Sequence, residues 1–420
     1  MIIWYFAILS AFVLFFAVDI FLDFLNLKHL KKMGSVVPEL FSGDVDEKEF
    51  KRINEYTAEK LNLGLIQKTF HSLILLFFVF FGIINLYNDI LFSWKLNYYF
   101  NGIVYLYLLI LLSTFLEIPF ALYSTFKIEK KYNFNNISLK LWVVDLIKSL
   151  VISFVIFSVL IGVSFLLMRV IFYWWIWVWL ALLLFSLFIM YISPFVIEPI
   201  FNKFVPVDDS ELVNKLTEIL RNAGVKLTRV LKIDASKRTK HTNAYFSGIG
   251  RTKRIVLFDT LLEKLNINEI VSVIAHEAGH WKKKHILKRF ILIESMLLII
   301  CNISYQIINS DFVINIFGIH TTGFYPVETY LPCVLFLVFF LFNLVSYPFT
   351  PIMNSISRTD EREADSYAAE LVGNTEDLSS ALKKLSKDNL SNLNPHRLYS
   401  LFHYSHPPLS ERLASLKKLK

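Results

Sequence analysis

Residues 142–167 read WVVDLIKSLVISFVIFSVLIGVSFLL, and only Met168 and Arg169 separate them from a second apolar run over 170–196. A helix needs roughly 20 apolar residues to cross about 30 Å of bilayer hydrocarbon, and both runs are longer than that. Backbone polar groups inside a bilayer must be bonded within their own segment, so each run is predicted to be a spanning helix. The pair therefore indicates a helical hairpin that crosses the membrane twice.

Apolar runs of spanning length recur along the rest of the chain, at about 2–22, 69–89, 102–124, 287–308 and 329–350. The composition agrees, because 55% of the 420 residues are hydrophobic and only 19% are charged, with a mean hydropathy of +0.51. The first run lacks the basic start of a cleaved signal peptide, so we interpret it as a retained span. We predict an all-α membrane protein with seven spans, for which the lipid bilayer is an obligatory partner.

Basic residues alternate between rich and poor loops. The loop after residue 24, the loop after the third span, the segment 198–286 and the tail after 350 are rich in Lys and Arg, whereas each of the other loops has at most one. Because basic loops stay in the cytoplasm, the N-terminus is predicted outside and both long polar regions inside. The net charge of +8 therefore requires no nucleic-acid partner. The membrane would be the endoplasmic reticulum in a eukaryote or the cytoplasmic membrane in a bacterium.

The polar regions divide the chain into four predicted parts: residues 1–197 with five spans, 198–286, 287–350 with two spans, and 351–420. Within 198–286 we expect a helix over 211–223, short strands over 229–233 and 254–258, and helices over 261–265 and 267–281. The last helix is predicted to run on into the sixth span. This pattern indicates a small α+β domain on the cytoplasmic side. The two cysteines, Cys301 and Cys333, lie in apolar runs, which excludes a disulfide framework or a cysteine metal site.

One pentapeptide carries chemistry: His276-Glu277-Ala278-Gly279-His280, an H-E-x-x-H sequence on a predicted helix. Two histidines four residues apart lie about 40° from each other around a helix axis, so both rings can reach one ion. Neutral imidazoles suit Zn²⁺, and a catalytic zinc site needs a third protein ligand and an open position. Glu277 lies beside the rings, where it can take a proton from the attacking water. The alternative is an ordinary helix with two histidines, but its apolar lead-in makes an unbound polar triplet costly.

The third ligand is expected from the other cytoplasmic region, where residues 357–365 begin a predicted helix. Glu361 and Asp365 share a face of this helix, and Arg358 precedes them by one turn. A carboxylate on the metal, with a second carboxylate orienting a histidine ring, is a common design of zinc sites. On the residues alone, Glu361 is only weakly preferred over Glu370.

Two neighbours of the motif are predicted to stand apart from it. His285 follows His280 by five residues, which rotates it by about 140° on a continuous helix, so we do not expect a ligand there. Glu363 lies on a different face from Glu361 and is expected to face solvent.

Taken together, these residues resemble the CAAX prenyl protease type 1 family of integral-membrane zinc metalloproteases. The resemblance extends beyond the pentapeptide and runs from about residue 45 to the end. It rests on Asn243-Ala244-Tyr245-Phe246, on Lys253–Leu261, on Pro119–Phe126, on Phe201-Asn202-Lys203-Phe204 and on His406-Pro407-Pro408-Leu409-Ser410-Glu411-Arg412.

The resemblance implies roles for eight residues. His276, His280 and Glu361 would bind one zinc ion, and Glu277 would be the general base. Asn243 would line the site on a strand that pairs with an extended substrate, and His406 would steady the oxyanion. Asp365 and Arg412 would support the metal ligands. Arg358, one turn before Glu361 on the same predicted helix, is expected to support them as well.

The resemblance also implies an architecture and an activity. The seven spans would form a barrel around a large water-filled chamber, with the metal site facing the cytoplasm. The activity would be removal of the last three residues of C-terminal CAAX-type prenylated peptides. Two alternatives stay open at this stage: a metalloprotease for membrane-protein quality control without prenyl dependence, and a transporter or scaffold without zinc.

Four charged residues fall inside apolar runs, where a charge is costly unless it faces protein or water. These are Glu117, Asp145, Lys148 and Glu294. They either pair with other protein groups or line the chamber, and the two interpretations are equally consistent with their spacing.

Overall fold

A computed structural model describes residues 1–33, 37–248, 252–320 and 330–419. Within these ranges seven helices are long and apolar enough to cross a membrane, which confirms the predicted number. The spans are Ile2–Met33, Glu47–Phe80, Tyr98–Glu129, Leu139–Val170, Trp174–Phe201, His285–Ile308 and Leu331–Val372. The start of the expected seventh run, residue 329, lies outside the described residues.

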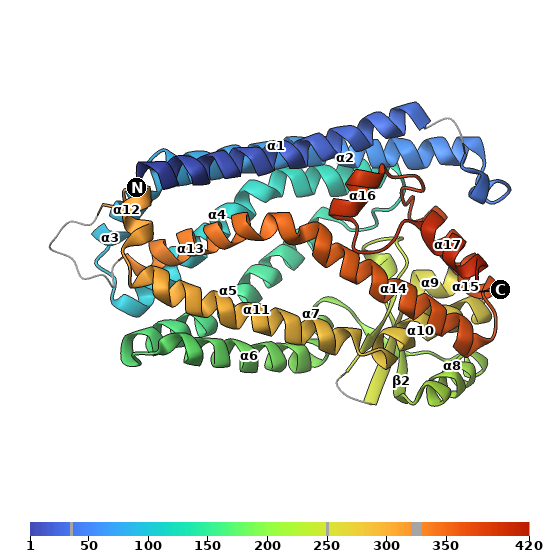
Figure 1. Cartoon of the computed structure of the whole chain (residues 1–420). Coiled ribbons are helices and arrows are strands. Elements are labelled where there is room, and N and C mark those ends of the chain that lie inside the picture. Colours follow the sequence, from blue (N-terminus) through green and yellow to red (C-terminus); the bar gives the residue numbers. More distant parts are fainter. Residues whose placement is uncertain (34–36, 249–251, 321–329, 420) are drawn as a thin grey trace.

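The spans are built from the following elements. They are α1 (Ile2–Met33), α2 (Glu47–Phe80), α4 (Tyr98–Tyr123) with the π-helical turn η2 (Ser124–Glu129), α5 (Leu139–Val170), α6 (Trp174–Ile192) with η3 (Ser193–Ile197) and α7 (Glu198–Phe201), α11 (His285–Ile308), and α13 (Leu331–Ser346) with η6 (Tyr347–Phe349) and α14 (Thr350–Val372). Short helices lie beside them: η1 (Glu39–Phe41), α3 (Ile83–Ser93) and α12 (Phe312–Phe317). The long helices run in roughly the same direction, and the sheet lies at one end of them (Figure 1).

One expected run, 69–89, is interrupted. Helix α2 ends at Phe80, and Gly82 adopts a left-handed conformation with a φ of 82° before α3 begins. Glycine takes this conformation without a steric penalty, so the chain can turn there. The second span compensates at its other end, because α2 begins at Glu47 and is much longer than its apolar part.

The polar region between the fifth and sixth spans folds as a small α+β unit, as predicted. Its elements are β1 (Phe204–Pro206), α8 (Ser210–Ala223), β2 (Lys226–Ile233), η4 (Ala235–Lys237), β3 (Ala244–Ser247), β4 (Thr252–Phe258), α9 (Asp259–Lys264) and α10 (Ile267–Lys282). The strand order is β1-β2-β4-β3, so β3 is an edge strand. β2 and β4 are parallel, and the two outer pairs are antiparallel.

A hydrophobic core beneath the sheet fixes α10. Leu216 of α8, Leu257 of β4 and Ile274 of α10 are fully buried in one cluster. Burying such side chains stabilises the fold by roughly 1.5–3 kcal/mol each. This packing uses one face of α10 and leaves the face with the two motif histidines directed at α14.

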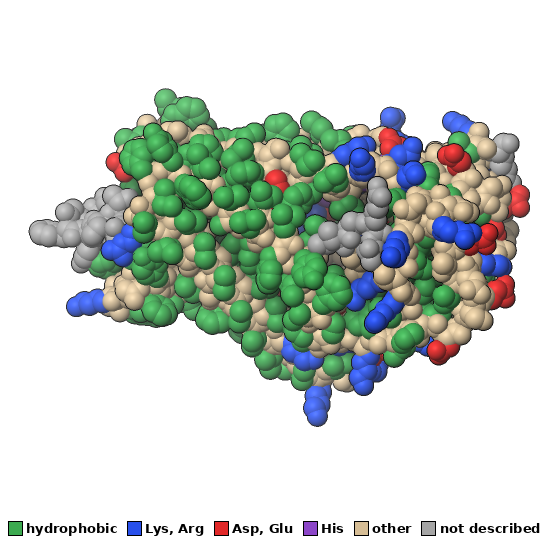
Figure 2. Space-filling view, turned by 90° about the horizontal axis from the view of Figure 1, so that it is seen from below, with side chains coloured by type: hydrophobic (Ala, Val, Ile, Leu, Met, Phe, Trp, Pro, Cys, Tyr) green, Lys and Arg blue, Asp and Glu red, His purple; other side chains and the backbone are tan. Residues whose placement is uncertain are grey.

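The C-terminal region covers that face. It consists of the polar end of α14, then α15 (Glu376–Asp388), α16 (Arg397–His403) and α17 (Leu409–Lys417). Figure 2 shows mostly hydrophobic side chains over the middle of the molecule, whereas most charged side chains gather at the end that holds these helices and the sheet. This distribution matches a membrane-embedded part and a part in water.

Most of the charged residues inside the apolar runs are paired. Glu117 accepts two hydrogen bonds from Gln67 of α2, at 2.7 and 2.8 Å. Asp145 pairs with Arg238 at 2.9 Å, and Lys148 donates to the carbonyl of Ile200 at 3.0 Å. These contacts favour the pairing interpretation, although one of the partners, Arg238, comes from the polar segment rather than from another span.

Glu294 differs from this set. It is 6% exposed, and its Oε2 atom has no hydrogen-bond partner among the described residues. Its backbone carbonyl accepts a hydrogen bond from the indole of Trp179 at 3.0 Å.

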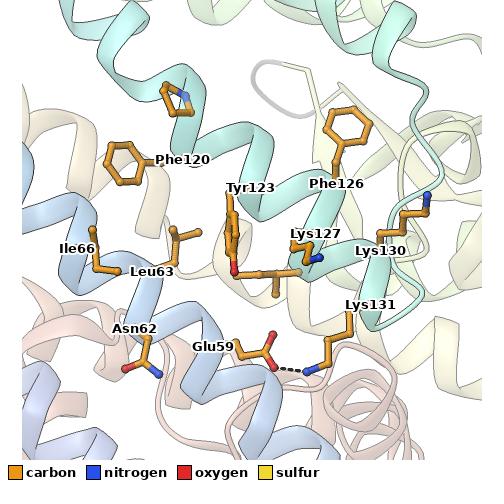
Figure 3. Close-up of a pocket in the computed structure, with 12 residues that line it drawn as sticks. Glu59, Asn62, Leu63, Ile66, Phe120, Tyr123, Phe126, Lys127, Lys130 and Lys131 are labelled. Atoms are coloured by element: carbon orange, nitrogen blue, oxygen red, sulfur yellow. Dashed lines mark hydrogen bonds and ion pairs between the residues drawn. The ribbon is translucent and has the colours of Figure 1, made fainter.

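Among the described residues, cavities that lie between elements of the spans include the following two. One of about 480 Å³ is lined by residues of α1, α2 and α13 that include Asp19, Lys68 and Asn343. The other, of about 1090 Å³, lies between α2 and the end of α4 (Figure 3). Leu63 and Phe120 are among its apolar lining residues, and Lys127 and Lys131 are at its polar end.

Candidate metal centre

Helix α10 holds its two histidines in a fixed frame. A capping box starts the helix, because Asn266 Oδ1 accepts from the Glu269 N–H and the Glu269 carboxylate accepts from the Asn266 N–H. Such boxes satisfy two backbone donors that a helix start leaves unpaired. Near the C-terminal end of α10, His276 and His280 lie one helical turn apart. Their Nε2 atoms point to the same place and are 3.2 Å from each other.

A glycine lets α14 approach this face of α10. A Cβ atom on Gly279 would lie 2.9 Å from the Cα atom and 3.0 Å from the carbonyl oxygen of Ala364. Real Cβ atoms do not come this close, so only glycine fits at position 279. The neighbour that comes this close is the backbone of α14.

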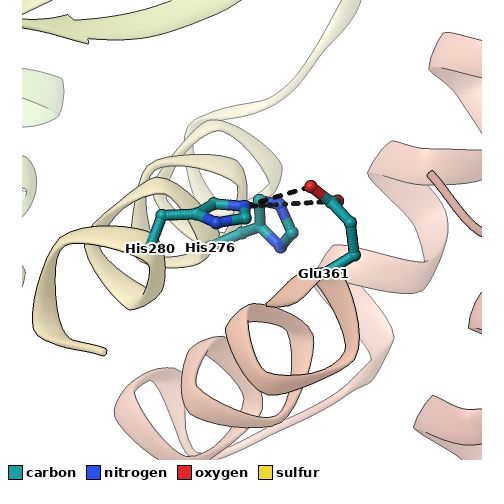
Figure 4. Close-up of side chains that lie close together, drawn as sticks. All are labelled: His276, His280 and Glu361. Carbon is teal, nitrogen blue, oxygen red and sulfur yellow. Dashed lines mark hydrogen bonds and ion pairs between the residues drawn. The ribbon is translucent and has the colours of Figure 1, made fainter. Parts of the chain in front are cut away.

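The close approach of α14 to α10 places the carboxylate of Glu361 next to the rings of His276 and His280. Its Oε2 lies 3.4 Å from His276 Nε2, and its Oε1 lies 3.3 Å from His280 Nε2 (Figure 4). One donor atom from each of the three residues lies within 4.8 Å of the others. Among the described residues this is the one set of histidine, cysteine and carboxylate side chains that meets the spacing for a metal ion. The three predicted ligands therefore form one cluster, whereas Glu370 is exposed on another face of α14.

The donor set fits a divalent cation. Glu361 is 3% exposed, and its Oε2 has no well-aligned hydrogen bond among the described residues. Burial alone would disfavour a charged ring at His276, but Asp365 and Glu361 outweigh it and raise the pKa of His276 to about 9. Nitrogen and oxygen atoms that converge in a buried site, in surroundings that favour positive charge, suit a metal ion.

The ion pair between Asp365 and Arg412 holds the ring of His276 in its orientation. Its Nδ1 lies 2.8 Å from Asp365 Oδ1, which leaves Nε2 free for the metal. Arg412 of α17 donates from Nη2 to Asp365 Oδ1 at 2.6 Å and from Nε to Oδ2 at 2.9 Å. Two parallel bonds of this kind fix the carboxylate plane, so α17 holds Asp365 in place against the ring.

The remaining predicted site residues lie at different distances from the cluster. His406 is close, with its Nδ1 atom 3.0 Å from Glu361 Oε2, and its side chain is 66% exposed. Glu277 is half-buried beside the rings, and its carboxylate makes no hydrogen bond or ion pair with the described residues. Asn243 is exposed at the start of β3, and its side chain caps the N–H of Ala244 at 2.8 Å. Arg358 points away and donates to the carbonyls of Leu401 and Tyr404, so it anchors α16.

His285 and Glu363 belong to the surroundings of the site, although neither was expected there. Helix α10 ends at Lys282 and does not continue into the sixth span, because Lys284 adopts a left-handed conformation with a φ of 58° before α11 starts at His285. The angle of about 140° assumed a continuous helix and is therefore wrong for His285. Its Nδ1 lies 3.0 Å from His280 Nδ1, and its Nε2 lies 3.1 Å from Glu363 Oε2. No glycine or proline marks this turn.

The fold and the metal cluster together define a multi-pass membrane metallopeptidase, and comparisons with known proteins identify its family. Residues 26–203 match the family model "CAAX prenyl protease N-terminal, five membrane helices". Residues 206–420 match "Peptidase family M48". The chain belongs to the CAAX prenyl protease 1 family, whose members are M48 metallopeptidases with a membrane-spanning N-terminal part.

The relatives align over almost the whole chain. CAAX prenyl protease 1 of Saccharomyces cerevisiae is 33% identical over 427 residues, covering 94% of this chain and 92% of its own. The CAAX prenyl protease 1 homolog of Homo sapiens is 31% identical, with 94% and 91% covered. The crystal structure of S. mikatae Ste24p superposes with a TM-score of 0.89 at 29% identity, over 98% of this chain and 99% of that one. These matches confirm the family and the fold class that the motifs predicted.

Proposed function

We propose that this protein is a zinc-dependent endopeptidase that cleaves C-terminal CAAX-type prenylated peptides and removes their last three residues. The observation that carries the proposal is the convergence of His276, His280 and Glu361 around one point, with the half-buried Glu277 directly after His276 on the same helix. The names of the yeast and human relatives support the substrate class.

Zinc is the metal that we propose for the site, one ion per chain. Two imidazoles and one carboxylate with an open fourth position are typical of catalytic zinc in peptidases. When bound, zinc supplies Lewis-acid activation of water and of the scissile carbonyl group. His276, His280 and Glu361 would hold it.

The protein side chains then have separate tasks. Glu277 takes a proton from the attacking water and passes it to the leaving amine, for which a carboxylate without a competing hydrogen bond is suited. His406 is close enough to Glu361 to face the same substrate, and its exposed ring can donate a hydrogen bond to the developing oxyanion. Asp365 and Arg412 keep His276 in the orientation that binds metal.

The substrate peptide would lie along β3. This strand is at the edge of the sheet, so its outer backbone groups can pair with an extended peptide. Asn243 is at the end of β3 nearest to α9, where its exposed side chain can contact the added strand. The prenyl chain would enter a chamber among the spans.

We also propose the membrane arrangement that the basic loops predict. Residues 198–286 and 351–420 would lie in the cytoplasm and residues 1–197 and 287–350 would supply the spans, so the active site would face the cytoplasm. The membrane would be the endoplasmic reticulum in a eukaryotic cell or the cytoplasmic membrane in a bacterium.

A second candidate keeps the chemistry and changes the substrate. "Uncharacterized metalloprotease YhfN" of Bacillus subtilis is 32% identical over 322 residues and covers 75% of this chain and 72% of its own. The name of this relative mentions no prenylated substrate. We therefore propose quality control of membrane proteins as the second function to test.

The decisive experiment compares two peptides that differ only by a farnesyl group on the cysteine of a C-terminal CAAX box. Detergent-purified protein with one equivalent of zinc should release the last three residues of the farnesylated peptide and leave the other intact. Equal cleavage of both peptides would favour the quality-control function. No cleavage of either would overturn the substrate assignment while leaving the metal site to be tested by zinc content.

A further inference from the structure

The turn between α10 and α11 brings a third histidine against the metal cluster. Only Lys283 and Lys284 separate the two helices, and the left-handed conformation of Lys284 breaks the helical course of the chain between them. The ring of His285 therefore meets the ring of His280, with centroids 5.1 Å apart and planes at 73°. His285 is 1% exposed.

The hydrogen bonds around these rings have one consistent assignment. His280 must present the lone pair of Nε2 to a metal, so its proton is on Nδ1. That N–H donates to His285 Nδ1 at 3.0 Å, which must therefore be the unprotonated nitrogen of His285. The proton of His285 is then on Nε2 and donates to a carboxylate.

Glu363 is the carboxylate that receives this bond. Its Oε2 lies 3.1 Å from His285 Nε2, whereas Asp360 Oδ1 is 3.6 Å away, too far for a hydrogen bond. Asp360 is also occupied by Arg289, which donates to its Oδ2 from Nε at 3.1 Å and from Nη2 at 3.0 Å. His285 is thus a buried neutral ring with both nitrogens bonded.

The two histidines of the motif are consequently supported in different ways. His276 bonds directly to the carboxylate of Asp365, whereas a whole imidazole ring separates His280 from Glu363. We propose that His285 is a positioning residue, which fixes the tautomer and the ring orientation of His280 through a His280–His285–Glu363 chain of hydrogen bonds. This inference rests on the proposed binding of zinc by His280.

The test measures zinc affinity by chelator competition on the purified full-length protein. His285→Leu removes the acceptor and should weaken zinc binding about 10–100-fold, the usual effect of losing a partner behind a metal ligand. His285→Asn keeps an oxygen acceptor near the position of Nδ1 and should recover most of that affinity. Glu363→Gln, at a half-exposed position, should weaken zinc binding by a smaller factor. The matched control is Glu370→Gln on the exposed face of α14, which should leave zinc binding unchanged.

A second readout separates positioning from a general effect on folding. The visible spectrum of the cobalt-substituted protein reports the ligand geometry directly, and it should change in His285→Leu and stay close to the wild type in His285→Asn. A folded His285→Leu protein with wild-type zinc affinity and an unchanged cobalt spectrum would overturn the inference. If the wild-type protein itself bound no zinc, the proposed function would fail instead, so the two failures are distinguishable.

Discussion

A Cβ atom on Gly279 would lie 2.9 Å from the Cα atom of Ala364, closer than real Cβ atoms come to a neighbouring backbone. The two residues mark the contact at which α10, which carries two of the predicted metal ligands, meets α14, which carries the third. The separation of these helices therefore sets the distance between Glu361 and the two imidazoles, currently 3.3 to 3.4 Å. The proposed binding of a metal therefore depends on the absence of a side chain at position 279.

Gly279→Ala should therefore impair the metal site. The added methyl group forces the two helices apart at a cost of about 1–3 kcal/mol, and Glu361 moves away from the rings. We expect weaker zinc binding in a chelator-competition assay and a lower thermal stability. The matched control is Gly64→Ala in α2, where an added Cβ meets no atom within 4 Å and the substitution should be neutral or mildly stabilising. Wild-type zinc affinity in Gly279→Ala would contradict this prediction, because it would show that α10 and α14 accommodate the methyl group without moving Glu361 away from the rings.

Glu277→Gln should abolish peptide cleavage while leaving the metal in place. Glutamine has the same shape but accepts no proton at neutral pH, so the rate should fall by at least about 10²–10⁴-fold. Zinc content should remain at one equivalent per chain, because Glu277 is not among the three clustered donors. Glu263→Gln, an exposed position on α9, is the control and should retain full activity. Intact cleavage by Glu277→Gln would mean that another group acts as the base.

Glu361→Ala and Glu370→Ala distinguish the two glutamates of α14 that the sequence left as candidates. Removing Glu361 leaves two imidazoles alone, so zinc affinity should fall by more than the roughly 10–100-fold expected for an outer partner. Removing the exposed Glu370 should change nothing. Metal analysis after dialysis against a weak chelator measures both, and a full zinc equivalent in Glu361→Ala would place the third ligand elsewhere.

The parts of this site that follow from local geometry were predictable. Helical spacing alone places His276 and His280 on one face, and apolar length alone gives seven spans. The preference for Glu361 over Glu370 rests mainly on the resemblance. The sequence of a polar helix does not show which of its faces will pack against a neighbouring element. The close contact at Gly279 selects the face, and that contact joins residues 85 positions apart.

The role of His285 was not predictable because the turn before it gives no signal. A left-handed residue is usually glycine or asparagine, and here it is Lys284. The partners of Asp145 and Glu117 were not predictable either, since Arg238 and Gln67 are distant in sequence and are brought near only by the tertiary fold. Gly82, by contrast, is a recognisable stop signal inside the expected run 69–89.

The start of α10 offers a test of pH dependence. Glu269 is 2% exposed, and it accepts hydrogen bonds from Ser380 at 2.6 Å, Lys384 at 2.9 Å and the backbone N–H of Asn266 at 2.9 Å. Burial opposes ionisation, but Lys384, Ser380 and this N–H outweigh it and hold the pKa of Glu269 below its usual value. Because the folded pKa is lower than the unfolded value of about 4.3, this stabilisation is fully present above that pH and is lost as the pH falls through the folded pKa.

Glu269→Gln should therefore destabilise the protein by about 2 kcal/mol at neutral pH, since it removes a hydrogen-bonded charge. Thermal unfolding of the two proteins should show a constant difference between pH 6 and 8, which narrows below about pH 4.3 as wild-type Glu269 takes up its proton. Glu263→Gln on α9 serves as the exposed control and should show no difference at any of these pH values. A Glu269→Gln difference that stayed constant down to pH 3 would mean that packing, and not the charge of Glu269, anchors the helix that carries the metal ligands.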